Sequence, residues 1–199
     1  MEKIKRQSGD VRRMQIKSAV KKILFYEGMQ KLTTKNIALE VGISEGTVFK
    51  HYTSKKAILD DILNDVTMEL VEPLQYIGHS TEPPLKRLEK HICFHLDYLT
   101  KNKGITILLF TEASYQNDTA LKKMLDKIYQ SMEQSFGNII RDGIAEGIWD
   151  EKVSIEDLSS LYMGIPLAMN IELLLHQGDI RGLNFCKNML DLLKRILRK

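Results

Sequence analysis

Hydrophobic residues along the chain recur with the three- and four-residue spacing of helices, and no useful stretch alternates as a strand would. In residues 11–27, for example, the apolar positions fall on one side of a helix that Gly28 ends. Spacing, capping residues and turn residues together predict about nine helices, at roughly 11–27, 34–41, 45–51, 55–75, 84–101, 105–115, 118–146, 154–177 and 183–199. We therefore expect an all-α protein.

The chain of 199 residues is long enough for one or two domains. Its clearest linker is 76–84, where Gly, Ser, Thr and Pro residues lie close together. The sequence predicts a small three-helix domain over 1–56 and a larger helical domain over 57–199, with the helix at 55–75 connecting them.

The two shortest predicted helices, 34–41 and 45–51, are separated only by Gly42, Ile43 and Ser44. Glycine can adopt the positive φ that such a tight turn commonly needs. Two short helices with this connection form a helix-turn-helix, in which the second helix enters the major groove of DNA.

The second of these helices has two different faces at 100° per residue. Val48 and Tyr52 lie together and can pack inward, whereas Gly46, Thr47 and Lys50 lie on the opposite side. Gly46 allows a close approach to the groove. Thr47 offers a hydroxyl and a methyl group to base edges, and Lys50 can reach guanine acceptors or a phosphate.

Positive charge is concentrated in the same part of the chain. Residues 1–56 contain 13 Lys or Arg against 5 Asp or Glu, whereas residues 57–199 contain 16 against 21. A basic domain on an acidic body indicates a polyanionic partner, although a solvated basic helix face would look similar. Helix N-termini attract phosphate, and we expect Thr34 and Ser44 to cap two of them and Lys55 to lie in the first turn of a third.

Residues 12–59 resemble the DNA-binding domain of the TetR family of transcriptional regulators. The matching residues are Ile16, Ala19, Leu24, Phe25, Gly28, Leu32, Thr33, Thr34, Ile37, Ala38, Val41, Gly42, Ile43, Ser44, Gly46, Thr47, Val48, Phe49, His51, Tyr52, Ser54, Lys55, Lys56 and Leu59. The resemblance implies an all-helical homodimer whose C-terminal domain binds a small molecule.

The resemblance also implies how individual residues meet double-stranded DNA. The positions that would contact the phosphate backbone are Thr34, Phe49, His51 and Lys55, and those that would face the bases are Lys35, Glu45, Gly46, Thr47 and Lys50. With Ser44, these complete the expected DNA-binding set. Phe49 replaces the tyrosine usual in the family and cannot hydrogen-bond to phosphate. Glu45 brings a negative charge near DNA, which is tolerable if it accepts from a cytosine amino group.

The acidic body carries methionine and aromatic residues at helical spacing, which are often ordinary core. The family resemblance, however, implies a ligand cavity among these helices. The expected lining residues are Phe94, Tyr98, Phe110, Tyr115, Met124, Tyr129, Met132 and Phe136. Because this set is apolar, the expected ligand is a hydrophobic small molecule.

The last two predicted helices carry apolar faces, formed by Leu161, Ile165, Ala168, Met169, Leu173, Phe185, Met189, Leu190, Leu193 and Ile196. Such faces from two copies of the chain can form a four-helix bundle, which predicts a homodimer through these helices. Burial within one chain is the alternative interpretation.

Two further features carry no expected site. His91 and His95 lie four residues apart, a spacing that can bind metal, but no third ligand is evident nearby and we expect two exposed histidines. Cys93 and Cys186 are too few for a disulfide framework and indicate a reducing compartment. Cys186 is expected to be a packing residue near the dimer face.

No phosphate loop, nucleophile elbow or paired-carboxylate motif occurs in the sequence, so neither catalysis nor a cofactor is expected. The apolar run 161–175 contains Asn170 and Glu172 and is shorter than the ~20 residues of a membrane span, and the N-terminus lacks the apolar stretch of a signal peptide. We expect a soluble cytoplasmic repressor that a hydrophobic ligand releases from a palindromic operator. An enzyme with an auxiliary helix-turn-helix and a non-specific nucleoid-type DNA-binding protein are the alternatives.

Overall fold

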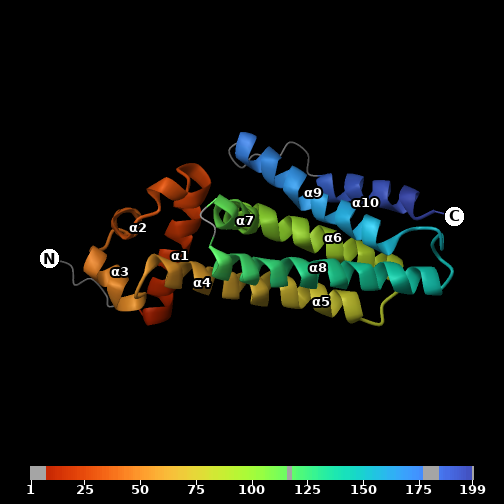
Figure 1. Ribbon diagram of the computed structural model, residues 1–199, viewed down its shortest axis with the longest axis horizontal. Coiled ribbons are helices and arrows are strands. Elements are labelled where there is room, and N and C mark those ends of the chain that lie inside the picture. Colours follow the sequence, from red (N-terminus) through yellow and green to blue (C-terminus); the bar gives the residue numbers. More distant parts are fainter. Residues whose placement is uncertain (1–7, 116–117, 177–183, 199) are drawn as a thin grey trace. The chain divides into compact units, whose positions relative to one another are not determined.

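The computed structural model describes residues 8–115, 118–176 and 184–198, and α-helices dominate it (Figure 1). No strand occurs in these ranges, so the expected all-α fold is confirmed. The chain divides into two compact units, unit 1 (Met1–Asn64) and unit 2 (Asp65–Lys199). The boundary lies inside a helix, some residues beyond the one expected from the sequence.

Unit 1 contains α1 (Gly9–Tyr26), a short 3-10 turn (Met29–Lys31), α2 (Thr34–Val41), α3 (Glu45–His51) and most of α4 (Lys55–Val66). One side chain from each helix shows how the core forms: Ile16, Ile37, Val48 and Ile58 are each completely buried. Helices this short gain their stability chiefly from packing of one apolar face, because isolated helices below about 12–15 residues are marginal in water.

The N-cap of α2 is Thr33 and not Thr34, which corrects the expectation from the sequence. Thr33 has an extended backbone, with φ −120° and ψ 154°, and its side chain accepts a hydrogen bond from the Asn36 amide at 3.1 Å. A cap needs this extended conformation, whereas Thr34 is already the first helical residue. The Thr34 hydroxyl is therefore free of a capping role.

Unit 2 contains the C-terminal end of α4, a π-helical turn (Thr67–Val71), α5 (Glu72–His79), α6 (Pro84–Lys101), α7 (Ile105–Tyr115), α8 (Thr119–Ala145), α9 (Ile155–Leu175) and α10 (Phe185–Ile196). The longest helix, α8, packs against α5, α6, α7 and α9 (Figure 1). Asp118 and Ser154 cap α8 and α9, accepting hydrogen bonds from amides of the first turn.

The helix expected over 55–75 is divided into α4, the π-helical turn and α5, so the described ranges hold ten α-helices. Pro73 explains the division, because it has no N–H to donate to the carbonyl of Glu69 and its ring crowds that carbonyl. A wider turn directly ahead of the proline relieves this conflict. The expected linker also begins too early, since residues 76–79 belong to α5.

His91 and His95 are buried and not exposed, which overturns a further expectation. Only 0% and 3% of these residues are exposed, since neighbouring helices cover this part of α6. His91 Nε2 lies 2.6 Å from Ser135 Oγ, which itself donates to the Leu74 carbonyl. Burial lowers the pKa of His91 to about 3, helped by the nearby positive groups, and that of His95 to about 4.

Arg87 is another buried polar residue in α6 that the sequence pattern did not indicate. Its guanidinium donates to the carbonyls of Ile77 and Gly78, in the last turn of α5, and to Asp142 of α8 at 2.7 Å. The Ile77 carbonyl also accepts from the Ser80 amide and hydroxyl, so Arg87 and Ser80 together cap the C-terminus of α5, and Arg87 ties it to α6 and α8. One side chain thereby fixes the mutual position of three helices.

Cys93 and Cys186 form a disulfide between α6 and α10, with their Cα atoms 5.3 Å apart. The expectation of two separate cysteines is wrong. Ninety-three residues separate the pair in sequence, and only the packing of α10 on α6 brings them together. A bridge closing a loop of this size constrains the unfolded chain by about 4–5 kcal/mol in the chain-entropy account.

The buried histidines predict a loss of stability in mild acid. The unfolded chain takes up protons below the ordinary histidine pKa of about 6.5, whereas the folded chain resists them until the pH approaches 3–4. The two neutral histidines therefore do not lower the free energy of unfolding above pH 6.5, and this free energy falls as the pH is lowered below that value. At pH 5 we expect a loss of about 2 kcal/mol per histidine relative to pH 8, measured by urea denaturation.

The variant His95→Gln keeps a side chain that can bond to its neighbour but does not titrate, and should remove about half of this dependence. His79→Gln, which alters an exposed histidine, serves as control and should retain it. An equal pH dependence in all three proteins would contradict the assignment to the buried pair.

Candidate functional site

The turn between α2 and α3 has the geometry that the sequence predicted. Gly42 has φ +74° and ψ 39°, the left-handed conformation, and its amide bonds to the last turn of α2. The Ile43 amide donates to the Ala38 carbonyl at 2.9 Å. Ser44 then caps α3, because its side chain accepts from the Thr47 amide at 3.2 Å. The turn is thus closed by backbone and side-chain hydrogen bonds on both sides.

The two faces of α3 are separated as expected. Val48 and Tyr52 are 0% and 4% exposed and pack into unit 1. Gly46 and Lys50 are exposed on the other side, and Phe49 keeps 50% of its surface accessible. The outer face therefore presents a small, a basic and an aromatic residue to the surroundings of unit 1.

The C-terminal end of α3 is held by α1, through contacts that the sequence did not reveal. Arg13 donates to the His51 carbonyl at 3.1 Å, and its guanidinium lies 4.8 Å from the centre of the Tyr52 ring. The Tyr52 hydroxyl donates to Asp61 of α4, which also lies 3.4 Å from Lys17 Nζ. This cluster of Arg13, Lys17, Tyr52 and Asp61 fixes the orientation of α3 relative to α1 and α4.

At the other end of α3, hydroxyl and carboxylate groups are paired with one another. The Thr34 hydroxyl donates to Glu45, and the Ser44 and Thr47 hydroxyls lie 2.8 Å apart. The Glu45 carboxylate is therefore drawn back toward α2. These hydroxyls can exchange their partners for DNA groups only if the internal hydrogen bonds open.

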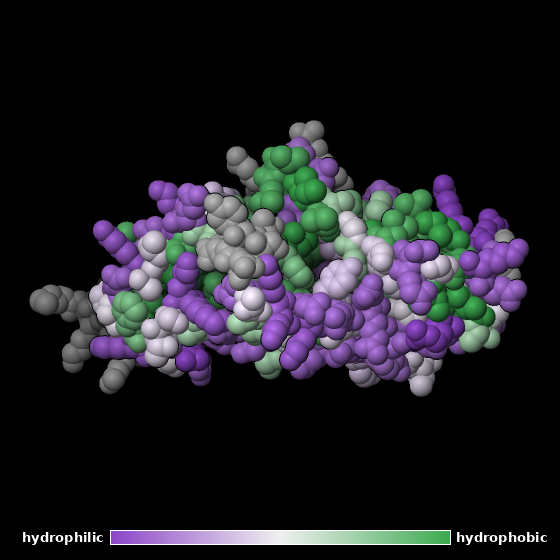
Figure 2. Space-filling model, viewed as in Figure 1, coloured by the Kyte–Doolittle hydropathy of each residue, from purple (hydrophilic) through white to green (hydrophobic). Residues whose placement is uncertain are grey.

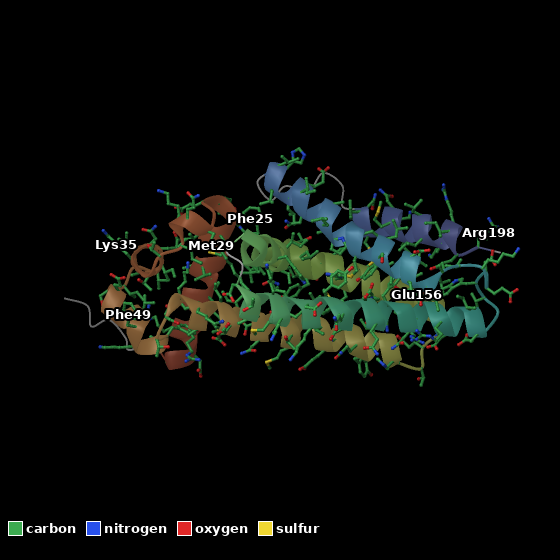
Figure 3. All side chains as sticks on the ribbon, in the orientation of Figure 1. Phe25, Met29, Lys35, Phe49, Glu156 and Arg198 are labelled. Atoms are coloured by element: carbon green, nitrogen blue, oxygen red, sulfur yellow. A yellow bond between two sulfur atoms is a disulfide. The ribbon has the colours of Figure 1, made fainter. Side chains whose placement is uncertain are left out.

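The remaining cations of the expected DNA-binding set lie on the surface of unit 1. Lys35 on α2 is exposed, and Lys55 is the first residue of α4, where Ser54 accepts from the Ala57 amide at 3.1 Å. Figure 3 shows Lys35 and Phe49 on the same side of unit 1. His51 is half-buried, and its carbonyl accepts a hydrogen bond from Arg13.

A capped tight turn, a buried inner face and an exposed, partly basic outer face define a helix-turn-helix DNA-binding protein. Residues 18–62 match the family model described as "Bacterial regulatory proteins, tetR family". Residues 18–62 therefore form a DNA-binding domain of the TetR type, and the chain is a DNA-binding transcriptional regulator.

Curated relatives include two proteins named nucleoid occlusion factor SlmA. That of Haemophilus influenzae strain PittGG is 25% identical over 168 residues, covering 81% of this chain and 77% of the relative. That of Glaesserella parasuis serovar 5 is 30% identical over 120 residues, covering 58% and 57%. These identities show similarity to the relatives and do not specify the DNA sequence that this chain binds.

Solved structures of regulators share the fold. The ketosteroid transcriptional regulator KstR2 of Mycobacterium tuberculosis aligns with a TM-score of 0.76 at 16% identity, covering 94% of this chain and 92% of that one. FadR of Bacillus subtilis, solved in complex with stearoyl-CoA, aligns with a TM-score of 0.69 at 17% identity, covering 92% and 96%. The likeness extends through both units and concerns the fold alone.

Unit 2 contains a partly open apolar cavity of about 250 Å³, lined by residues of α6, α7, α8 and α9. Its lining residues are His95, Leu99, Thr106, Ile107, Phe110, Tyr129, Met132, Met163, Pro166 and Leu167. Three of the expected lining residues, Phe110, Tyr129 and Met132, are among them. The lining residues of α9, and the polar residues His95 and Thr106, were not expected from the sequence.

The other expected lining residues lie elsewhere. Phe136 is buried and stacks on Tyr162, with ring centroids 4.1 Å apart and ring planes 2° apart. Tyr98 is also buried, whereas Phe94 and Met124 are half-buried and do not line the cavity. The side chain of Tyr115 lies outside the described residues.

The outer sides of α9 and α10 expose apolar residues, and Figure 2 shows hydrophobic side chains gathered over these helices. The exposed residues are Leu161, Leu167, Ile171, Leu174, Leu175, Leu192 and Ile196. By contrast, Ile165, Met169, Leu173, Leu190 and Leu193 are buried within the chain. Of the apolar residues expected to form the dimer interface, some are therefore buried within the chain and others are exposed on its surface. We call the seven exposed residues the α9–α10 face.

The helix α9 is longer than the apolar run in the sequence. It has 21 residues with a mean hydropathy of 1.4 in its most apolar window, and by length and composition it passes for a membrane span. However, 44% of that window is buried inside the protein. A core helix with one exposed apolar face passes the same test. The described residues contain no group of three or more His, Cys, Asp and Glu able to hold a metal ion.

The Tyr52–Asp61 hydrogen bond predicts a measurable effect on stability. Replacing Tyr52 with Phe keeps the buried ring but removes the hydroxyl that donates to the carboxylate. We expect unfolding of unit 1 to become easier by about 1.5–3 kcal/mol, the typical worth of a hydrogen bond to a charged group. Urea denaturation measures the change. Tyr76→Phe, at a position 78% exposed, is the matched control, and an equally small effect of both variants would refute this role.

Proposed function

We propose that this regulator is a homodimeric repressor that binds a palindromic operator and is released by a hydrophobic small molecule. The observation that carries the DNA-binding part is the outer face of α3, which stays exposed while Val48 and Tyr52 anchor the inner face. The apolar cavity of unit 2 supports the ligand part.

The family resemblance implies phosphate contacts from Thr34, Phe49, His51 and Lys55, and base contacts from Lys35, Glu45, Gly46, Thr47 and Lys50. Ser44 is added to this set because it caps the N-terminus of α3, where free amides attract phosphate. Phe49 would contribute apolar contact, because it has no hydroxyl. Glu45 is the one negatively charged residue in this set. The hydrogen bond that it accepts from Thr34 would hold its carboxylate away from phosphate until a cytosine amino group donates to the carboxylate instead.

Positioning and reading contacts should separate in binding measurements. Lys55→Ala should weaken binding to every DNA sequence and reduce the salt slope by about one per site, because it removes a phosphate contact. Thr47→Ala should cost about 1–3 kcal/mol on the operator and little on random DNA. Fluorescence anisotropy titrations across salt concentrations measure both effects.

Lys127→Ala, which removes an exposed cation from α8, is the control and should leave both affinities unchanged. Loss of the same factor on both DNAs in the Lys55 and Thr47 variants would show that this division of roles is wrong.

The proposed dimer interface is the α9–α10 face. Seven apolar side chains exposed on two adjacent helices form a surface of the kind that monomers rarely leave open. A second copy of the chain can cover it by an isologous four-helix arrangement. Such a dimer would present two α3 helices to successive major grooves ~34–36 Å apart, which requires a palindromic site.

The α9–α10 face predicts which substitutions give monomers. Ile171→Glu and Leu192→Glu each place a charge on the exposed side of a helix, so the chain should fold normally but fail to associate. Light scattering should give the monomer mass with an unchanged melting temperature. Substitutions at Met169 or Leu193 would instead unfold the chain, since both are buried within it.

Tyr76→Glu adds the same charge on α5, at an exposed position outside this face, and should remain dimeric. A wild-type mass for both the Ile171 and the Leu192 variants would place the interface elsewhere.

Release by a ligand requires two conformations that the ligand and the operator favour differently. Operator DNA must then weaken ligand binding by the same factor as the ligand weakens DNA binding, with coupling energies of about 1–3 kcal/mol typical. The proteins with related folds include a ketosteroid transcriptional regulator and a FadR solved with stearoyl-CoA, a molecule with a long acyl chain, which supports the proposal of an organic small-molecule ligand.

A second candidate function follows from the curated relatives, which are named nucleoid occlusion factors. A protein of that kind would bind DNA without being released by a ligand in the cavity. The α3 surface serves both functions equally, whereas the apolar cavity favours the ligand-responsive repressor.

Selection of bound genomic fragments by the purified protein tests the proposal. One palindrome enriched at few loci, with a specificity ratio of at least ~10³ over random DNA, is the expected result for a repressor. Uniform recovery of fragments, with a ratio near one, would reject it. Many dispersed copies of one site would instead favour the second candidate.

A further inference from the structure

The cavity of unit 2 has an unusually simple polar content. None of its lining residues is Lys, Arg, Asp or Glu. Its polar side chains are those of His95, Thr106 and Tyr129, and only the first two are almost completely buried, with 3% of each exposed. The polar atoms of a ligand can therefore bond to these three side chains, of which His95 and Thr106 are the buried ones, or to water.

The hydrogen-bonding state of His95 follows from its partner. His95 Nδ1 lies 2.6 Å from the Tyr162 hydroxyl, which is buried, and 1% of Tyr162 is exposed. A buried hydroxyl must give its hydrogen to an acceptor, and Nδ1 is the acceptor at hand. Because burial holds the imidazole pKa at about 4, the ring is neutral and carries its one hydrogen on Nε2. His95 can therefore donate one N–H to a ligand.

Thr106 supplies a second polar group, a hydroxyl that lacks a hydrogen-bond partner. Its Oγ1 is buried and has no hydrogen-bond partner among the described residues. An unpaired buried hydroxyl destabilises a protein, so a native one calls for an explanation. Threonine populates two χ1 rotamers in a helix, and Thr106 is the second residue of α7, so its hydroxyl can turn toward a bound molecule.

We propose that the cavity takes an uncharged, largely apolar molecule bearing one carbonyl or hydroxyl oxygen, which accepts from His95 Nε2 and bonds to the Thr106 hydroxyl. This inference rests on the proposed ligand-binding role of unit 2. At about 30 Å³ for each small group, 250 Å³ accommodates roughly eight to ten non-hydrogen atoms.

The same lining disfavours a charged ligand. A carboxylate buried here would find no cation among the lining residues, and an ammonium group would find no anion. Burying an ion without a partner is far more costly than burying a neutral carbonyl that is hydrogen-bonded. The cavity therefore selects by charge as well as by shape.

Three probes of similar size and shape test this selection: acetophenone, which carries a ketone oxygen; α-methylstyrene, which replaces that oxygen with a CH₂ group; and benzoate, which is charged. Dissociation constants come from ligand-observed NMR titrations of the full-length protein. We expect acetophenone to bind and benzoate to bind at least tenfold more weakly. Benzoate binding as tightly as acetophenone, or no binding of acetophenone at millimolar concentration, would overturn the proposal.

Variants of Thr106 assign the oxygen contact. Thr106→Val preserves shape and should lower the preference for acetophenone over α-methylstyrene roughly three- to tenfold, the usual effect of one hydrogen bond. The free protein should be as stable as the wild type or more so, since an unpaired hydroxyl is removed. Thr106→Ser keeps the hydroxyl and should retain the preference. An unchanged preference in Thr106→Val would refute the contact.

Ile107→Val is the matched control, because it shortens another lining side chain of α7 without changing polarity. It should alter the affinity for both neutral probes alike. The imidazole ¹⁵N spectrum gives an independent readout, in which the proton of His95 should reside on Nε2 and its signal should shift with acetophenone only. A proton on Nδ1 would contradict the proposed donor.

These measurements need no DNA, so they fail independently of the proposed repressor function. If the probe preferences hold but acetophenone leaves operator affinity unchanged, the proposed ligand class is supported and the proposed release by ligand is contradicted. If all probes bind equally while DNA is released, the release is supported and the proposed ligand class is contradicted.

Discussion

The proposed DNA-binding surface of this protein depends on the burial of the inner face of α3. Helix α3 has seven residues, too few to persist by itself in water. Packing stabilises this helix, because Val48 and Tyr52 are buried in unit 1. Its two ends are held as well: Ser44 caps the N-terminus, and Arg13 donates to the carbonyl of His51, the last residue of α3. The residues of α3 proposed to contact DNA are those on its opposite, exposed face.

A similar constraint shapes unit 2, where the fixed points are buried polar groups that need partners. Arg87 satisfies the end of α5, and His95 is oriented by Tyr162. Because each buried donor and acceptor is costly when unpaired, these contacts restrict how the helices can pack. Four buried polar atoms have no partner among the described residues: His91 Nδ1, the Tyr98 hydroxyl, the Thr106 hydroxyl and Asn170 Oδ1. Of these four residues, only Thr106 lines the cavity.

The sequence predicted the elements that local rules determine. The α2–α3 turn followed from Gly42 and Ser44, and the inward face of α3 followed from helical spacing. It did not predict contacts between residues far apart in the chain. The Cys93–Cys186 bridge depends on how α10 packs against α6, which periodicity does not encode.

The candidate sites show the same division. The DNA-binding residues could be proposed from the sequence pattern because they lie in one short segment, whereas the cavity draws on four helices. Spacing identified Phe110, Tyr129 and Met132 but missed His95, which looked like an exposed histidine until neighbouring helices covered α6. Burial of a polar residue is a property of the packed structure, and a single helix gives no sign of it.

Hydrogen exchange with and without DNA tests most directly whether the α2–α3 segment is the DNA-binding surface. The operator need not be known, since at low salt a mixed-sequence duplex binds through its phosphates. The account predicts that DNA slows amide exchange in peptides covering residues 33–55 and leaves peptides of α8 and α9 unchanged. Slowed exchange in unit 2 with no change over residues 33–55 would contradict it.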